Sequence, residues 1–291
     1  MAFTLILKDG REAIFHGPQV MGIVNVTPDS FYALSRVSDD DALTTRVNDM
    51  IEAGAAMIDV GAYSTRPDAA EVSAEEELDR LRRALPVIRE AVGNRDVLIS
   101  VDTFRADVAE VCVAQLGADI INDVSGGMLD GVMLETVART KAPYVMMHMR
   151  GTPQTMQSLT DYPDGVYADV KQFFERQLSA LSDVWVAVNG EAMPGGKVML
   201  DPGFGFAKTL AQNYELMGGM HRLKEDFCGC PLFVGISRKS MIYRLLDTDA
   251  DHALNGTTVL NTYSVMNGAD ILRVHDVREA VETVRIIGQM M

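Results

Sequence analysis

The feature that most constrains the fold is a structural unit that recurs along most of the chain. From residue 20 onward, a short apolar run is followed by a polar loop and then by a longer stretch whose apolar residues have helical spacing. The apolar runs predict eight β-strands, at residues 20–26, 57–61, 97–103, 119–124, 144–149, 198–201, 232–236 and 271–275. Helical patterns separate them, among others at residues 41–53, 74–91, 106–115, 132–140, 166–188 and 277–287.

Nearly continuous apolar strands that alternate with helices indicate a parallel sheet with a covered outer face. Eight such units close more readily into a (β/α)₈ barrel, the TIM barrel, than into an open sheet. A doubly wound open sheet is the alternative fold. The glycine fingerprint of a dinucleotide-binding unit is missing after the first strand, where Gly22-Ile-Val-Asn-Val-Thr27 stands. We therefore expect an α/β TIM barrel.

The segment before the first unit has a different pattern. Residues 3–15 alternate apolar and polar residues on both sides of Asp9-Gly10, a dipeptide that suits a two-residue hairpin turn. We expect an N-terminal β-hairpin, with residues 1–17 as a cap. No linker or shift of composition interrupts the units that follow, so residues 1–291 are expected to form a single domain.

The net charge of the chain limits the classes of partner that it can bind. The formal net charge is -15, from 26 basic and 41 acidic residues, and it argues against nucleic acid or an anionic membrane as the main partner. No apolar stretch approaches the ~18 residues of a membrane helix, and no export signal is visible. The three cysteines suggest no disulfide framework. These patterns favour a cytoplasmic protein, and an anionic ligand would need a local cationic pocket.

Polar residues close each of the predicted strands. In a parallel barrel these residues share one rim, the C-terminal mouth where the chemistry takes place. Asp102, Asn122 and Asp201 are expected to face inward together and to hydrogen-bond a planar heterocycle rich in amino and ring N–H groups. Lys239 adds a donor for a ring nitrogen or carbonyl oxygen, and the guanidinium plane of Arg273 can stack on an aromatic ring.

A second set of polar residues suits the oxygens of phosphate or pyrophosphate. Amide, hydroxyl and cationic donors bind such oxygens. The set comprises Asn25, Thr65, Arg66, Arg273 and His275. Single residues have simpler interpretations, because Lys239 can begin a solvated helix and Arg66 can lie in a surface loop. His148 receives no role, since a buried or supporting histidine is the commoner case.

Seven segments, spread over nearly the whole chain, form a specific combination. They are Met21-Gly-Ile-Val-Asn-Val-Thr-Pro-Asp-Ser-Phe31, Ser64-Thr-Arg-Pro67, Ser100-Val-Asp-Thr103, Ile121-Asn-Asp-Val-Ser125, Asp201-Pro-Gly-Phe-Gly-Phe206, Gly235-Ile-Ser-Arg-Lys-Ser240 and Arg273-Val-His-Asp-Val277. In this order they resemble the dihydropteroate synthases, a family of pterin-binding enzymes.

The resemblance implies a reaction of folate biosynthesis. The amino group of p-aminobenzoate attacks 6-hydroxymethyl-7,8-dihydropterin pyrophosphate, pyrophosphate leaves, and 7,8-dihydropteroate forms. The implied pterin site is Asp102, Asn122, Val124, Met147, Asp201, Phe206, Lys239 and Arg273. The implied pyrophosphate site is Asn25, Thr65, Arg66, Arg273 and His275, and p-aminobenzoate would contact Thr65, Pro67 and Ser240, the last at a helix N-terminus.

The resemblance also implies a mechanism in which ionisation precedes attack. Asp102, Lys239 and Arg66 would be catalytic, Mg²⁺ would be reached through Asn25 and the phosphates, and Asp102 would stabilise the cation at the pterin methylene. No enzyme nucleophile is needed. The loops at residues 27–38 and 62–72 would close over the acceptor site. Family analogy further suggests a homodimer and a sulfonamide target.

Two loops depart from the common pattern of the family. Gly61-Ala-Tyr-Ser-Thr-Arg-Pro-Asp68 stands in place of Gly-Gly-Glu-Ser-Thr-Arg-Pro-Gly, and Phe31-Tyr-Ala-Leu34 in place of Phe-Ser-Asp-Gly. Loop shape and sulfonamide affinity are therefore open. Two other functions are alternatives at this point: a pterin-barrel methyltransferase, which should not need Ser237-Arg-Lys-Ser240, and a catalytically silent pterin-binding module, which would have an eroded charged site.

Overall fold

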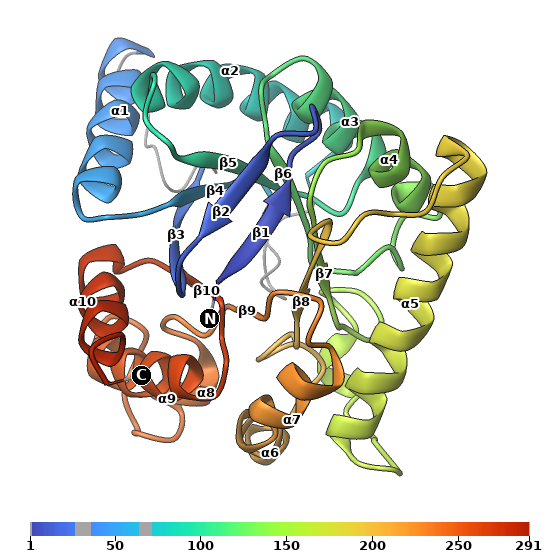
Figure 1. Ribbon diagram of the computed structural model, residues 1–291. Coiled ribbons are helices and arrows are strands. Elements are labelled where there is room, and N and C mark those ends of the chain that lie inside the picture. Colours follow the sequence, from blue (N-terminus) through green and yellow to red (C-terminus); the bar gives the residue numbers. More distant parts are fainter. Residues whose placement is uncertain (1, 27–35, 64–71, 291) are drawn as a thin grey trace.

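Eight parallel strands form a nearly closed barrel surrounded by helices (Figure 1). The computed structural model describes residues 2–26, 36–63 and 72–290. The barrel strands are β3 (Gln19–Asn25), β4 (Met57–Gly61), β5 (Leu98–Asp102), β6 (Ile120–Asp123), β7 (Tyr144–Met147), β8 (Val198–Asp201), β9 (Phe233–Val234) and β10 (Ile271–Val274). Their order is β8-β7-β6-β5-β4-β3-β10-β9, and one parallel bridge between Leu200 and Leu232 joins the two ends. The expected TIM barrel is confirmed.

The interior of the barrel is divided into an apolar floor and a polar layer above it. Side chains that point into a parallel barrel recur every second residue along each strand. Seven barrel residues form one buried apolar cluster, namely Met21, Met57, Ile120, Val145, Met199, Phe233 and Ile271. Two residues further along the same strands lie the polar side chains Asp59, Asn122, Asp201 and Arg273. The strand pattern therefore carries these polar groups into the mouth of the barrel.

An N-terminal hairpin covers the floor of the barrel, as Figure 1 shows for its two blue strands. Strands β1 (Phe3–Ile6) and β2 (Glu12–Phe15) pair antiparallel, and Phe3 and Leu5 belong to the apolar cluster of the floor. Lys197 anchors the hairpin from below β8, because its Nζ donates to the carbonyl oxygens of Ile6 at 2.6 Å and Leu7 at 3.0 Å.

The hairpin turn differs from the two-residue turn that Asp9-Gly10 suggests. Leu7 N donates to Arg11 O at 2.9 Å and Gly10 N donates to Leu7 O at 3.0 Å, so three residues form the loop. Gly10 has a φ of 86°, which fits the left-handed position at the end of a three-residue hairpin loop.

Helices cover the outer face of the sheet. They are α1 (Arg36–Glu52), α2 (Ala74–Val92), α3 (Ala106–Ala114), α4 (Met133–Thr140), α5 (Val166–Asn189), α6 (Leu210–Gly218), α7 (Met220–Asp226), α8 (Ser240–Tyr243), α9 (Leu254–Met266) and α10 (Val277–Ile287). A short 3-10 helix spans Met156–Ser158. None of the helices in the described part of the chain is long and apolar enough to cross a membrane.

Candidate active site

Four polar side chains form one hydrogen-bonded network in the barrel mouth. Arg273 on β10 donates from Nε to Asp59 Oδ2 and from Nη2 to Asp102 Oδ2, each at 2.6 Å. Asn122 on β6 donates from Nδ2 to the same Asp59 oxygen at 3.0 Å. Because strands β10, β4, β5 and β6 supply the four residues, the fold brings groups far apart in sequence into direct contact.

Asp201 and Lys239 form the facing part of the mouth. Asp201 ends β8, and its Oδ1 accepts a hydrogen bond from Gly203 N at 2.8 Å. Lys239 Nζ donates to Phe204 O at 2.7 Å and lies 4.7 Å from the centroid of the Phe206 ring. The loop after β8 thus holds both a carboxylate and an ammonium at the rim.

Burial shifts the pKa values of the charged groups in the barrel mouth. Removal from water raises the pKa of Asp102 to about 7, against the attraction of Arg273 and with added repulsion from Asp59. Burial likewise raises the pKa of Asp201, although Lys239 opposes the shift. Burial lowers the pKa of Lys239 to about 8, and Asp201 partly offsets this effect. Desolvated charges of this kind gather at functional sites.

An apolar wall lies beside these polar groups. Val124, Met147, Met149, Met156 and Ala207 form a small buried cluster, with Phe104, Leu129 and Phe206 packed against it. Val124 directly follows β6 and Met147 ends β7, the strand between those that carry Asn122 and Asp201. Carboxylates, an amide and a cation next to an apolar surface suit a flat heterocycle with polar edges.

The rim above the network is more open. Asn25 at the end of β3 is exposed, and a Cβ added to Gly61 would lie 3.6 Å from Asn25 Oδ1 and 3.5 Å from Asp102 Cβ. A Cβ at this position would therefore be in ordinary van der Waals contact with both residues. His275 is also exposed at the rim, with its Nδ1 3.1 Å from Ser237 Oγ.

Ser240 begins α8 directly after Lys239, as expected, but this helix has only four residues. Its dipole is correspondingly small, because fewer aligned peptide units contribute to it. Thr65, Arg66 and Pro67 lie outside the described residues, as do most of the loops at residues 27–38 and 62–72. The structure thus brings together the expected pterin residues and two of the expected pyrophosphate residues, Asn25 and His275, with Arg273 shared between the sets.

A second polar cluster lies behind the loop that follows β8. Lys208 is buried, and its Nζ donates to the carbonyl oxygens of Gly203 at 2.9 Å and Phe206 at 3.0 Å. The same Nζ lies 3.0 Å from His148 Nδ1, and His148 Nε2 lies 2.9 Å from Asp169 Oδ1. Burial lowers the pKa of His148 to about 4, so the ring is neutral and the cluster supports the loop rather than a proton transfer.

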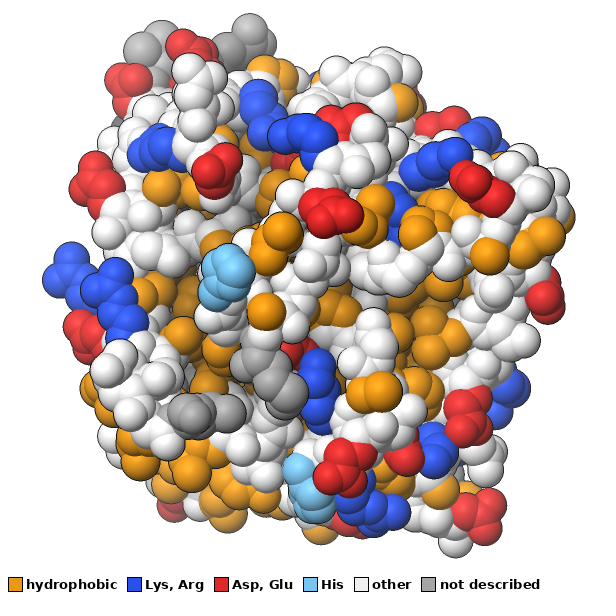
Figure 2. All heavy atoms as spheres, in the orientation of Figure 1, with side chains coloured by type: hydrophobic (Ala, Val, Ile, Leu, Met, Phe, Trp, Pro, Cys, Tyr) orange, Lys and Arg blue, Asp and Glu red, His pale blue; other side chains and the backbone are white. Residues whose placement is uncertain are grey.

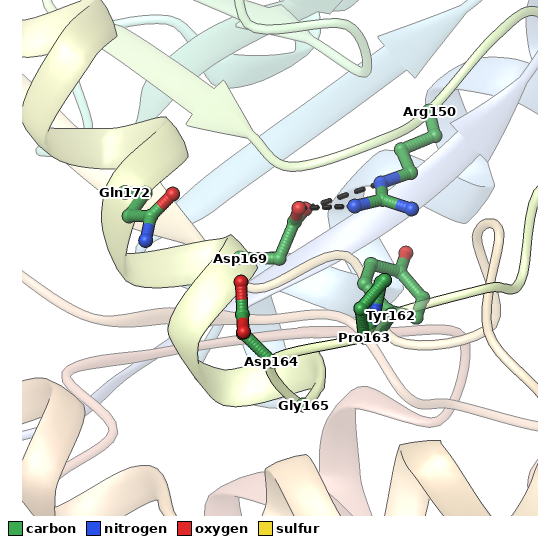
Figure 3. Close-up of a pocket in the computed structure, with 7 residues that line it drawn as sticks. All are labelled: Arg150, Tyr162, Pro163, Asp164, Gly165, Asp169 and Gln172. Carbon is green, nitrogen blue, oxygen red and sulfur yellow. Dashed lines mark hydrogen bonds and ion pairs between the residues drawn. The ribbon is translucent and has the colours of Figure 1, made fainter.

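Asp169, a member of this cluster, also lines a small cavity, and Figure 3 shows Arg150 and Asp169 pointing toward each other there. It has a volume of about 100 Å³ and is lined by Arg150, Tyr162, Pro163, Asp164, Gly165, Asp169 and Gln172. Among the residues that the structure describes, none of the expected pterin or pyrophosphate residues lines it. The cavity is therefore separate from the described part of the expected site.

Asp59, Ser237 and Lys208 are the functional candidates that the sequence interpretation missed. Asp59 is an acidic residue inside an apolar strand, two residues before Gly61, and the period of two along a strand places it on the inner face. Ser237 lies inside the segment Gly235–Ser240, where the expected roles fall on Lys239 and Ser240, and Lys208 lies two residues after the segment Asp201–Phe206. A test of inward-facing positions along each strand would have found Asp59.

Comparisons with known proteins identify a family that matches most of the chain. The family described as "Pterin binding enzyme" matches residues 21–275. The dihydropteroate synthase of Escherichia coli (strain K12) is 44% identical over 284 residues, which cover 97% of this chain and 95% of that protein.

Two solved structures are similar over nearly their full length. The Yersinia pestis dihydropteroate synthase, in complex with a sulfonamide drug, has a TM-score of 0.84 and 39% identity, covering 100% of this chain and 99% of that one. The Xanthomonas albilineans enzyme with 4-aminobenzoic acid has a TM-score of 0.83 and 34% identity, covering 100% and 98%. From fold, site and sequence together, the chain belongs to the pterin-binding enzyme family, and within it to the dihydropteroate synthases, transferases of folate biosynthesis.

Proposed function

We propose that the protein condenses 6-hydroxymethyl-7,8-dihydropterin pyrophosphate with p-aminobenzoate in the barrel mouth, giving 7,8-dihydropteroate and pyrophosphate. The observation that carries this assignment is the convergence of Asp102, Asn122, Asp201, Lys239 and Arg273 beside an apolar wall. Residues 1–291 act as one pterin-binding domain, with residues 1–17 as its cap.

The pterin ring is recognised through its polar edge and its two faces. Asn122 and Asp201 accept hydrogen bonds from amino and ring N–H groups, and Lys239 donates to a ring nitrogen or carbonyl oxygen. Val124, Met147 and Phe206 contact the ring as apolar walls, supported by their place in one cluster. The Arg273 guanidinium, held by Asp59 and Asp102, stacks on the ring.

Asp102 stabilises the positive charge that develops at the pterin methylene when the C–O bond to pyrophosphate breaks. The p-aminobenzoate nitrogen then forms the new C–N bond and loses a proton. A carboxylate in a desolvated site stabilises a cation more strongly than one in water, because the local dielectric is low. No covalent enzyme intermediate is required.

The pyrophosphate group binds at the rim, at Asn25, Arg273 and His275, and at Thr65 and Arg66 outside the described residues. The described residues contain no group of three His, Cys, Asp or Glu side chains that would hold a metal. A single amide oxygen on Asn25 still fits Mg²⁺, because that ion is commonly bound by one or two protein groups together with substrate phosphates. When bound there, Mg²⁺ supplies charge neutralisation for the phosphate oxygens.

p-Aminobenzoate binds near Ser240, with Thr65 and Pro67 completing the site. Ser240 lies next to Lys239 along the chain, so the acceptor ring would approach the pterin from the side of α8. Sulfonamides, which carry a similar aniline ring, compete for this position. Support comes from the relatives whose structures contain a sulfonamide drug and 4-aminobenzoic acid.

The protein forms a homodimer through α9 and α10. Val259, Tyr263 and Met266 recur at helical spacing on α9 and are 58%, 39% and 58% exposed. Ile286 on α10 is 64% exposed, and Met290 just after this helix is 72% exposed. Hydrophobic side chains gather at the lower left of Figure 2, where Figure 1 places these helices. An exposed apolar patch of this kind is typical of a protein interface.

Light scattering tests the homodimer. The wild-type protein is expected to be a dimer, and a variant with both Val259→Glu and Met266→Glu a folded monomer. A wild-type monomer would contradict this part of the proposal.

We further propose that the protein acts in the cytoplasm, since Cys112, Cys228 and Cys230 are all free thiols and a reducing compartment keeps them so.

Pyrophosphate release tests the reaction. The purified protein is mixed with the pterin pyrophosphate and Mg²⁺, with and without p-aminobenzoate. Rapid release together with formation of dihydropteroate is expected only when p-aminobenzoate is present, and chelation of Mg²⁺ should suppress it. Pterin binding without product formation would contradict the proposed reaction and favour a silent binding module.

A further inference from the structure

We propose that Asp59 is a positioning residue for pterin binding, whose buried carboxylate orients both the Arg273 guanidinium and the Asn122 amide in the barrel mouth. The inference rests on the pterin-binding roles proposed above for those two residues. It concerns a side chain that does not itself belong to the proposed ligand set.

Asp59 lies at the centre of the network. Strand β4, which carries it, is two strands from β6 with Asn122 and two strands from β10 with Arg273. A single oxygen, Oδ2, accepts from Arg273 Nε at 2.6 Å and from Asn122 Nδ2 at 3.0 Å. The two sides of the pterin pocket are therefore connected through one carboxylate.

The contact with Asn122 decides which end of its amide faces the ligand. An ionised carboxylate oxygen can only accept hydrogen bonds, so the amino group of Asn122 must point toward Asp59. The amide oxygen is then the atom left to accept an N–H group of the pterin edge. Without the carboxylate, a rotation that exchanges the amide oxygen and amino group is no longer opposed.

The burial of Asp59 is costly for folding, which argues against a purely structural role. The side chain is 0% exposed, and its second oxygen, Oδ1, has no hydrogen-bond partner among the described residues. A buried carboxylate with one unsatisfied oxygen destabilises the folded state. Retention of such a group is explained if its charge is needed for the geometry of the mouth.

Asp123 provides a matched structural control. It is also wholly buried, on β6, but both of its oxygens are satisfied. They accept hydrogen bonds from Ser125 N, Ser125 Oγ, Gly127 N and Tyr144 OH at 2.7–2.8 Å. These donors belong to the turn after β6 and to β7, and none belongs to the proposed ligand set, so Asp123 shares the burial of Asp59 without its contacts.

The charge of Asp59 also bears on Asp102, which shares Arg273 with it. The charged groups that act on Asp102 are Arg273, which attracts its ionised form, and Asp59, Glu77 and Asp123, which repel it. A neutral residue at position 59 removes the repulsion between Asp59 and Asp102. Asp102 is then the only carboxylate that pairs with Arg273 in this network. Both changes lower the pKa of Asp102, so its ionisation would move to lower pH.

Steady-state kinetics of Asp59→Asn test the inference, with Asp123→Asn as the control and Mg²⁺ present. Asp59→Asn is expected to raise the KM for the pterin pyrophosphate by about tenfold or more, because a buried charged hydrogen bond is lost. The KM for p-aminobenzoate should be nearly unchanged, and the acidic limb of kcat/KM should move to lower pH. Asp123→Asn should lower the melting temperature while leaving the KM for the pterin pyrophosphate at its wild-type value.

The same series separates failure of this inference from failure of the proposed site. Asn122→Ala should also raise the KM for the pterin pyrophosphate. If it does and folded Asp59→Asn behaves as wild type, the role of Asp59 is refuted. If neither variant changes that KM, the pocket assignment itself is wrong.

A second variant covers the case in which Asp59→Asn does not fold. Asp59→Ala leaves a space that formate can enter, and added formate should restore the KM for the pterin pyrophosphate. A normal KM without formate, or a raised KM that formate does not lower, would overturn the proposal.

Discussion

Arg273 Nη2 donates to Asp102 Oδ2 at 2.6 Å across the barrel mouth, yet the carboxyl of Asp102 is harder to ionise than a carboxyl in water. The cause is burial, whose effect on the pKa exceeds the attraction of the guanidinium. The protein therefore holds a negative charge where it is poorly solvated. Such a charge can stabilise a developing cation without first reorganising water around it.

Replacement of Asp102 by Asn should lower turnover strongly. The amide keeps the shape of the side chain but removes the charge that would face the pterin methylene. We expect kcat to fall by about a hundredfold or more, the usual effect of losing one electrostatic contact in an active site. Thermal melting establishes that the variant is folded, and turnover near the wild-type value would refute the assigned role.

The pH dependence of the reaction should report the same carboxyl. The pKa of Asp102 is raised to about 7, so protonation below that pH removes the charge and deprotonation above it restores the charge. We expect kcat/KM to rise with pH through this region and to fall again above about pH 8, where the Lys239 ammonium loses its proton. Rates of wild type and Asp102→Asn, compared across the range, test this, because the step should be absent from the variant.

Loss of the Lys239 ammonium should weaken pterin binding. Lys239 lies next to the Phe206 ring and in the field of Asp201, so its ammonium is placed to donate to the pterin ring. Lys239→Ala should cost about 1.5–3 kcal/mol of binding free energy if a charged hydrogen bond is lost. Calorimetric titration with a pterin measures this directly. An unchanged affinity would remove Lys239 from the pocket.

Lys208 should make the free energy of unfolding depend on pH in the alkaline range. Burial lowers its pKa in the folded state to about 7 from an ordinary value of 10.5. Between these values the unfolded chain binds a proton that the folded protein does not, so the free energy of unfolding rises with pH. Below about pH 7 both states are protonated and this contribution is constant.

Lys208→Met should flatten that rise by up to about 1.4 kcal/mol per pH unit. Urea titrations at several values of pH, with the surface variant Lys171→Met as control, provide the measurement. Equal slopes for wild type and Lys208→Met would show that Lys208 is not desolvated as described.

Truncation of Leu5 should destabilise the fold and spare the site. Leu5 is 0% exposed in the floor of the barrel, at the end opposite the mouth. Leu5→Ala should lower the free energy of unfolding by about 2–5 kcal/mol through lost burial and the cavity left behind. The KM for the pterin pyrophosphate should stay at its wild-type value. A large change in KM at constant stability would contradict the separation of floor and mouth.

Much of the fold follows from the sequence pattern alone. The predicted strands 57–61 and 198–201 coincide with β4 and β8, because each is a short apolar run that ends in a turn signal. The strand predicted at 232–236 shortens to the two residues of β9, since only those residues pair fully with β10. Pairing depends on neighbours from distant parts of the chain, which a local pattern does not contain.

The polar residues at the strand ends of the candidate site could be predicted from the sequence. The hydrogen bonds between residues on different strands could not. Asp102, Asn122 and Asp201 stand at or near strand ends, where the barrel collects functional groups. Asp59 stands inside a strand, so its link to Arg273, 214 residues away, depends on barrel closure. The length of α8 was also beyond the sequence pattern, because tertiary packing decides where a short helix ends.

The seam between β8 and β9 is the weakest joint in the barrel wall. In the described part of the chain, a single bridge connects them, from Leu200 on β8 to Leu232 just before β9, and β9 is two residues long. Asp201 lies on one side of the seam and Lys239 on the other. A pterin bound to both residues therefore links the two sides and stabilises the seam. Ligand binding should therefore slow amide hydrogen exchange most in this part of the wall, and the empty enzyme should open there first.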